Sequence, residues 1–210
     1  MLKLNDAIAQ LDQANSTEAL IVATRQLASL TNLAAAPKLI EVLSFNNPAA
    51  ALVAVDGLIA LGQDVVPSIL SNLDAHNYGA RAWAIRVLAD LGDVRGITAL
   101  IDALLNDVGP SVRRTAARGL GDLRLKTETG DGQEPLNRCI QALLQARKDG
   151  EWVVRYAITT GLERQIQSEQ LSSALKSEAY GVLEELASDQ EDTNVVRQRA
   201  KLALQRLTAP

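Results

Sequence analysis

Hydrophobic residues along this chain recur at helical spacing, and strand-type alternation is nearly absent. The segment Ile97, Leu100, Ile101 and Leu104 is representative, because its apolar residues fall three or four positions apart. This spacing places one apolar face on each predicted helix. We therefore predict an all-α chain.

One helical pattern occurs six times, most clearly in residues 77–88, 109–120 and 151–162. Each copy follows another apolar helix, for example residues 97–105 or 136–146. Two helices in every 30 to 45 residues or so are typical of HEAT or armadillo repeats. We predict an α-solenoid of about five to six two-helix repeats, curved with a concave binding face. It forms one continuous domain over residues 1–210.

Proline and glycine mark the predicted helix boundaries. Asn47-Pro48 and Gly109-Pro110 are typical of helix starts, and Gly62 and Gly92 of helix ends. A column of small residues in the repeated helices is predicted to permit close helix approach: Gly57, Gly119 and Gly161.

Charged residues also recur at equivalent positions of the repeats. The arginines are Arg81, Arg113, Arg155 and Arg197. The acids are Asp107, Asp149 and Glu191. Stacking would bring these acids and arginines together as a ladder between successive repeats. We interpret this ladder as mainly structural.

Composition narrows the classes of function. The 210 residues are 47% hydrophobic and carry a net charge of −4, which excludes intrinsic disorder and predicts no nucleic-acid partner. No apolar run reaches the roughly 20 residues of a membrane span, and no signal peptide is evident, so we expect a cytoplasmic protein. One cysteine and one histidine cannot form a zinc site, and we expect no metal.

No motif of a common enzyme class is present. The chain lacks a G-x-S-x-G elbow and a Walker motif. Cys139 falls on a predicted apolar helix face, which favours a buried and inert thiol. His76, in a predicted turn, is the one side chain whose unperturbed pKa lies near neutrality.

Aromatic and basic residues gather in the repeated helices. The aromatic residues are Tyr78, Trp83, Trp152 and Tyr156, and the basic residues are Arg86, Arg114 and Arg118. Two interpretations remain open. In the first, the aromatic rings fill gaps between helices, and Arg86 and Arg118 form i,i+4 pairs with Asp90 and Asp122. Alternatively, both line a wall that binds a flat, conjugated, anionic ligand.

The segments 77–84 and 149–157 resemble a known family. Together with Asn46 to Ala50 and Ser111 to Gly121, they are similar to the HEAT-like bilin lyases of cyanobacteria, in particular the smaller F-type subunits of heterodimeric phycocyanobilin lyases. The resemblance covers approximately residues 15–165. It implies an enzyme that attaches phycocyanobilin to a cysteine of the phycocyanin α subunit through a thioether, together with a larger E-type subunit.

For such a reaction, residue type and position suggest roles for the candidate residues. Because the acceptor supplies the nucleophile, the lyase needs neither a reactive cysteine nor a permanently bound cofactor; phycocyanobilin is its substrate. The candidate catalytic residues are Tyr78, Glu151 and His76, with Glu151 facing the pyrrole nitrogens. The candidate bilin-binding residues are Arg86, Arg114, Arg118, Trp152 and Tyr156. The arginines would bind the propionates, and the aromatic rings would stack on the pyrroles.

One departure from the family concerns isomerisation. Some F-type relatives isomerise the bilin and carry an N-H-C-like motif, whereas His76-Asn77-Tyr78 has no adjacent cysteine. We therefore predict attachment without isomerisation. Two alternatives remain: a non-catalytic HEAT scaffold that binds phycobiliproteins during assembly or degradation, and a general protein-interaction solenoid unrelated to pigments.

Overall fold

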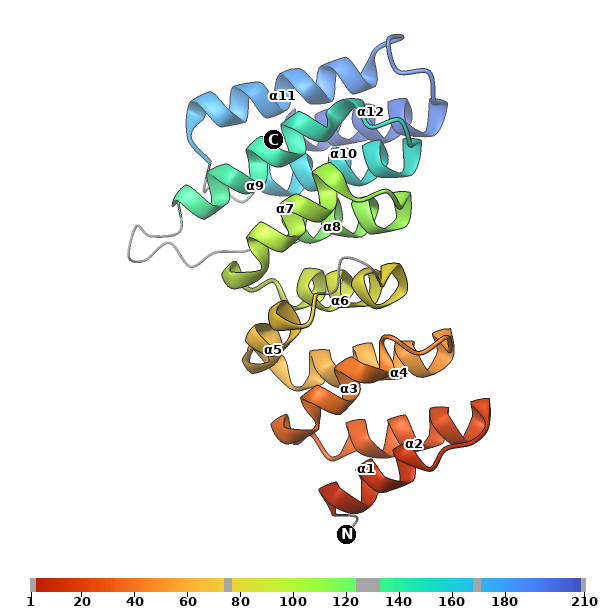
Figure 1. Ribbon diagram of the computed structural model, residues 1–210. Coiled ribbons are helices and arrows are strands. Elements are labelled where there is room, and N and C mark those ends of the chain that lie inside the picture. Colours follow the sequence, from red (N-terminus) through yellow and green to blue (C-terminus); the bar gives the residue numbers. More distant parts are fainter. Residues whose placement is uncertain (1–2, 74–76, 124–132, 168–170, 209–210) are drawn as a thin grey trace. The chain divides into compact units, whose positions relative to one another are not determined.

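The computed structural model describes residues 3–73, 77–123, 133–167 and 171–208, and these residues contain helices and no strand (Figure 1). They divide between two compact units, Met1–Arg95 and Gly96–Pro210. The predicted all-α fold is confirmed, whereas the single domain over 1–210 and the concave curvature stay predictions.

The first unit stacks three helix pairs in two layers. The second helices of the pairs form one layer, in which α2 packs on α4 and α4 on α6, and α3 and α5 pack together in the other layer (Figure 1). The helices are α1 (Leu4–Asp12), α2 (Thr17–Ser29), α3 (Ala36–Val42), α4 (Pro48–Ala60), α5 (Val66–Ser71) and α6 (Tyr78–Leu91). Short 3₁₀ helices occupy Leu33–Ala35 and Gly62–Val65.

The second unit repeats the arrangement with longer helices. Here α8 packs on α10 and α10 on α12, while α7, α9 and α11 form the other layer (Figure 1). The helices are α7 (Ile97–Asn106), α8 (Pro110–Asp122), α9 (Gln133–Gln145), α10 (Trp152–Gln167), α11 (Ser173–Ala187) and α12 (Asn194–Thr208). Further 3₁₀ turns occupy Val94–Gly96 and Ala146–Lys148. The six helix pairs confirm the two-helix repeat and the solenoid class.

Side-chain caps and left-handed glycines confirm the predicted helix boundaries. The Asn47 side chain accepts a hydrogen bond from the Ala50 N–H at 3.1 Å, with Pro48 in the first turn of α4. Asn77 caps α6 in the same way through Ala80 at 3.0 Å. Helix α6 ends where Gly92 adopts a φ of 60°, a left-handed conformation that glycine adopts without a Cβ clash.

Helices α8 and α10 approach each other closely at two glycines. A Cβ on Gly121 would lie 2.3 Å from the Cα of Gly161, so the two backbones touch. The predicted close approach at Gly161 is therefore confirmed, and its partner is Gly121. At Gly57, an added Cβ would lie 2.7 Å from the Ala28 Cβ on α2. These contacts bring neighbouring second helices near enough to share one surface.

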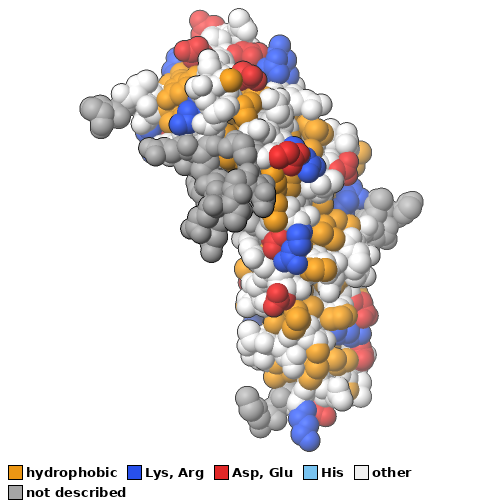
Figure 2. Space-filling model, turned by 90° about the vertical axis from the view of Figure 1, so that its left-hand side faces the viewer, with side chains coloured by type: hydrophobic (Ala, Val, Ile, Leu, Met, Phe, Trp, Pro, Cys, Tyr) orange, Lys and Arg blue, Asp and Glu red, His pale blue; other side chains and the backbone are white. Residues whose placement is uncertain are grey.

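The core consists of aliphatic side chains between the two layers. On the face shown in Figure 2, the remaining hydrophobic side chains are interspersed with charged ones. Within the described ranges, no single helix is long and apolar enough to cross a membrane, and the segments Pro48–Ala60 and Gly62–Ser71 meet that criterion only as a pair bent by 118°.

Candidate functional site

The predicted ladder of arginines and acids is present in the second unit. The Arg113 guanidinium binds Asp149 through two hydrogen bonds, Nε to Oδ2 at 2.7 Å and Nη2 to Oδ1 at 2.9 Å. Arg155 binds Glu191 in the same way, at 2.7 and 2.6 Å. Each arginine thus joins its own repeat to the next, which confirms the predicted ladder contact for these two pairs.

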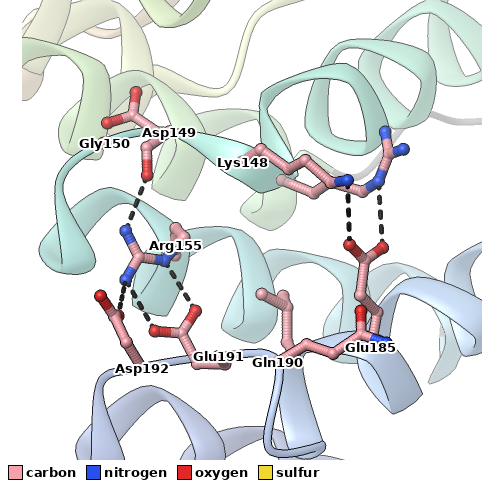
Figure 3. Close-up of a pocket in the computed structure, with 10 residues that line it drawn as sticks. Lys148, Asp149, Gly150, Arg155, Glu185, Gln190, Glu191 and Asp192 are labelled. Atoms are coloured by element: carbon pink, nitrogen blue, oxygen red, sulfur yellow. Dashed lines mark hydrogen bonds and ion pairs between the residues drawn. The ribbon is translucent and has the colours of Figure 1, made fainter.

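Three of the four ladder arginines also bind a backbone carbonyl six positions before them. The Nη1 atoms of Arg113, Arg155 and Arg197 donate to the carbonyls of Asp107, Asp149 and Glu191 at 2.9, 2.7 and 2.5 Å. Figure 3 shows Arg155 between Asp149 on one side and Glu191 and Asp192 on the other. These residues line a cavity of about 440 Å³, in which protein groups already engage Arg155. This cavity is therefore a structural junction and a poor ligand site.

The ladder lowers the pKa of its carboxyl groups. Burial raises the pKa of Asp149, but hydrogen bonds from Arg113 and the Glu151 N–H, with the charges of Arg113 and Arg155, hold that pKa below its ordinary value. Hydrogen bonding from Arg155 likewise lowers the pKa of Glu191 against the opposing effect of burial. Both carboxylates are ionised at neutral pH.

Acid is expected to destabilise the protein through this ladder. Because both pKa values are lower in the folded state, their contribution is complete above about pH 5 and is lost as the pH falls below about 4. Thermal unfolding followed at a series of pH values measures the loss. An Asp149→Asn/Glu191→Gln variant should show a weaker pH dependence, and an unchanged dependence would contradict the assignment.

A second cavity of about 320 Å³ lies between α8 and α10. Residues four positions apart place their side chains on one helix face, so α8 contributes Arg114 and Arg118, and α10 contributes Tyr156, Thr160 and Arg164. The remaining lining residues are Thr115, Val153, Ala157 and Gly161.

A third cavity of about 330 Å³ adjoins the second. Arg114, Trp152, Val153, Tyr156 and Val195 line it. Three of these residues, Arg114, Val153 and Tyr156, also line the second cavity. The two cavities therefore share part of their walls, and together we call them the α8–α10 groove.

The three arginines of the groove differ in their protein contacts. Arg164 forms an ion pair with Asp122, and Asp122 thereby engages α10. Within the described ranges, no ion pair or hydrogen bond engages the exposed guanidinium of Arg114. Arg114 is thus a cation at the junction of both cavities, available to an anionic ligand.

The structure brings together four of the predicted binding residues: Arg114, Arg118, Trp152 and Tyr156. Tyr156 and Trp152 are 37% and 46% exposed, so neither side chain is buried between helices. Sequence reasoning missed Arg164 and Val195 as lining residues. Tyr156, Thr160 and Arg164 stand four residues apart, and this spacing was the available signal.

The other predicted residues lie elsewhere. Glu151 is exposed and lines neither cavity of the groove, and its N–H donates to Asp149 at 2.9 Å. Arg86 belongs to the first unit, where its Nε lies 3.9 Å from Asp90 and its guanidinium 5.9 Å from the Trp83 ring. The predicted Arg86–Asp90 pair is thereby confirmed.

Two further predicted catalytic residues also belong to the first unit. Tyr78 is 43% exposed, and its ring centre lies 5.7 Å from the Arg81 guanidinium. His76 lies outside the described residues. The catalytic roles of both residues stay predictions.

Among the described residues, no cysteine lines the groove. Cys139 is fully buried, and burial raises the pKa of its thiol to about 12, so the thiol is protonated at neutral pH. Its predicted core position is confirmed. Within the described ranges, no three His, Cys, Asp or Glu side chains are grouped to hold a metal ion. The cationic and aromatic side chains of the groove are of the types that bind acidic, conjugated ligands.

Comparisons with known proteins agree with this organisation. Residues 36–121 and 66–163 match the family model for HEAT repeats. The chain is 48% identical to the bilin biosynthesis protein RpcF of Synechococcus sp. strain WH8020, over 98% of this chain and 97% of that protein. It is 45% identical to the phycocyanin alpha phycocyanobilin lyase CpcF of Synechocystis sp. strain PCC 6803, over 74% of this chain and 73% of that protein.

A solved structure provides the corresponding structural comparison. One chain of the complex of CpcE and CpcF of phycocyanin lyase from Nostoc sp. PCC7120 superposes with a TM-score of 0.72 and 40% identity. The match covers 82% of this chain and 99% of that chain.

Proposed function

Because the chain belongs to the family of HEAT-repeat phycocyanobilin lyase subunits, we propose that it is the smaller, F-type subunit of a heterodimeric bilin lyase. The lyase attaches phycocyanobilin to a cysteine of the phycocyanin α subunit. The relative CpcF carries that activity in its name, and the CpcE–CpcF complex supports a larger E-type partner. The bilin is thus a substrate of the lyase.

The α8–α10 groove is the observation that supports bilin handling by this subunit. Its cavities of about 320 and 330 Å³ lie in the size range of small-molecule sites. Arg114 and Arg118 offer guanidinium groups to the two propionates, which are ionised at neutral pH. Tyr156 and Trp152 offer exposed aromatic faces to the conjugated pyrrole rings.

In this reaction, the task of the lyase is to bind the bilin and to orient it toward the acceptor thiol. The acceptor thiol adds across the exocyclic double bond of the bilin: sulfur bonds to the ethylidene carbon, the thiol proton goes to the adjacent ring carbon, and nothing leaves. The nucleophile therefore belongs to the acceptor. Holding the bilin in near-attack geometry replaces a random encounter with an oriented one.

Several finer assignments belong to this proposal. The bilin is attached without isomerisation, no cofactor is permanently bound, and the protein acts in the cytoplasm. The proposal also keeps the roles assigned from residue type and position to Tyr78, Arg86, Glu151 and His76. Arg114, Arg118, Trp152 and Tyr156 share one groove and therefore carry the bilin-binding role most directly.

Reconstitution tests the proposal. The chain is co-expressed with an E-type subunit and the phycocyanin α subunit in a host that makes phycocyanobilin. The denatured acceptor is then analysed for covalent pigment. We expect unisomerised phycocyanobilin on the acceptor only when both lyase subunits are present. If all components are soluble and no adduct forms, the lyase proposal fails and a scaffold role replaces it.

Arg118→Ala is expected to weaken bilin handling without unfolding the protein. Loss of a charge-assisted hydrogen bond to a propionate corresponds to about a 10- to 100-fold loss in affinity. Because Arg118 is exposed, the thermal midpoint should change little. Adduct yield and thermal unfolding are measured together. Arg138→Ala is the matched control, since this exposed α9 arginine lines neither cavity of the groove.

A further inference from the structure

The α8–α10 groove has two chemically different ends. The end beside Arg118 is cationic, because Arg114, Arg118 and Arg164 line the 320 Å³ cavity. The end beside Trp152 is mainly apolar, because Trp152, Val153 and Val195 line the 330 Å³ cavity. A ligand with acidic groups at only one part of its length meets a different environment at each end.

Tyr156 and Arg114 lie where the two ends join, because both residues line both cavities. Arg114 comes from α8 and Tyr156 from α10, and the contact between Gly121 and Gly161 keeps these helices close. The junction therefore combines one guanidinium with one exposed aromatic ring. A conjugated ligand passing this point can stack on the ring while the guanidinium binds an acidic group beside it.

An open-chain tetrapyrrole has a matching asymmetry. Its two propionates lie on the central rings, whereas the terminal rings carry small alkyl or alkenyl substituents and a lactam. Placing a terminal ring among arginines would bury apolar surface poorly. A propionate beside Trp152 and Val195 would have only Arg114 as a cationic neighbour in that cavity, whereas the other cavity adds Arg118 and Arg164. One direction of binding is thus favoured.

We infer that the cavity formed by Trp152, Val153 and Val195 is a subsite for one terminal pyrrole ring, and that it sets the direction of the bilin in the groove. This inference rests on the proposed function. The propionates lie on the side of Arg114 and Arg118, and Tyr156 stacks on the ring between them and the subsite. Trp152 and Val195 are 46% and 45% exposed, so a ring held there keeps one edge accessible to an acceptor.

The test measures separately how the charged end and the apolar end of the groove contribute to bilin binding. Phycocyanobilin and its dimethyl ester, which lacks both carboxylates, are titrated against the lyase heterodimer, and binding is followed by pigment absorbance. The variants are Arg114→Gln for the charged end and Trp152→Ala for the apolar end. Val108→Ala is the control, because this side chain is 82% exposed and lines neither cavity.

We expect Arg114→Gln to weaken binding of the free acid about tenfold and to leave binding of the ester unchanged. Trp152→Ala should weaken both ligands by the same factor, also about tenfold. Equal losses for both ligands in both variants, or unchanged ester binding by Trp152→Ala, would overturn the subsite while leaving the lyase proposal intact. Failure of the unmodified heterodimer to bind phycocyanobilin would overturn the proposed function and the subsite together.

Discussion

Arg155→Ala is expected to lower the free energy of unfolding by about 3–5 kcal/mol, because it removes one partner of a buried ion pair. The Arg155 side chain is 12% exposed and that of Glu191 is 3% exposed. Without the guanidinium, the Glu191 carboxylate stays buried but loses two hydrogen bonds. The Asp149 carbonyl loses another. Chemical denaturation of the variant and the unmodified chain measures the difference.

A double-mutant cycle identifies the origin of this loss. Adding Glu191→Gln to Arg155→Ala should recover part of the stability, since the buried charge is then gone. Arg118→Ala should leave the free energy of unfolding nearly unchanged. Equal losses of stability in Arg155→Ala and Arg118→Ala would refute the division between ladder arginines and ligand-binding arginines.

Gly121→Ala is expected to destabilise the second unit by about 3 kcal/mol, the upper part of the usual range for overpacking. The new Cβ would lie 2.3 Å from the Gly161 Cα, which is a backbone atom that no rotamer change can move away. Helices α8 and α10 must separate, and the groove between them must change shape. Thermal unfolding and phycocyanobilin titration should therefore both report a loss.

Two further glycine variants provide comparisons for the stability of Gly121→Ala. Gly161→Ala should cost less, because its Cβ would lie 3.1 Å from the Gly121 Cα. Gly181→Ala on α11 should raise stability by about 0.5–1 kcal/mol, since nothing lies within 4 Å and alanine favours the helix. If Gly121→Ala were as stable as Gly181→Ala, the two helices could not be in backbone contact.

Local patterns were sufficient to predict the helices and the ladder. Apolar spacing, Asn47-Pro48 and Gly92 each act within a few residues of the chain, so no tertiary information is needed to interpret them. The pairs Arg113–Asp149 and Arg155–Glu191 were also predictable, because stacked repeats place equivalent residues one above another.

The site was predictable only where it followed the repeat. Arg114, Arg118 and Tyr156 stand at equivalent or successive positions of neighbouring second helices, and the structure places them in one groove. Glu151 was selected by residue type, and its place at the start of α10 leaves its side chain outside that groove. The ion pair between Asp122 and Arg164 on α10 was not predicted, because only pairs along α8 were considered.

The sequence by itself determined that this protein is a stack of helix pairs joined by arginine–carboxylate pairs, since periodicity encodes both features. Tertiary structure decided which side chains share a cavity. That outcome depends on the distance between α8 and α10, which the contact of Gly121 with Gly161 sets. It also depends on Val195, which reaches the groove from the next repeat. Contacts between helices follow from packing across the repeats, and a linear pattern contains no measure of that distance.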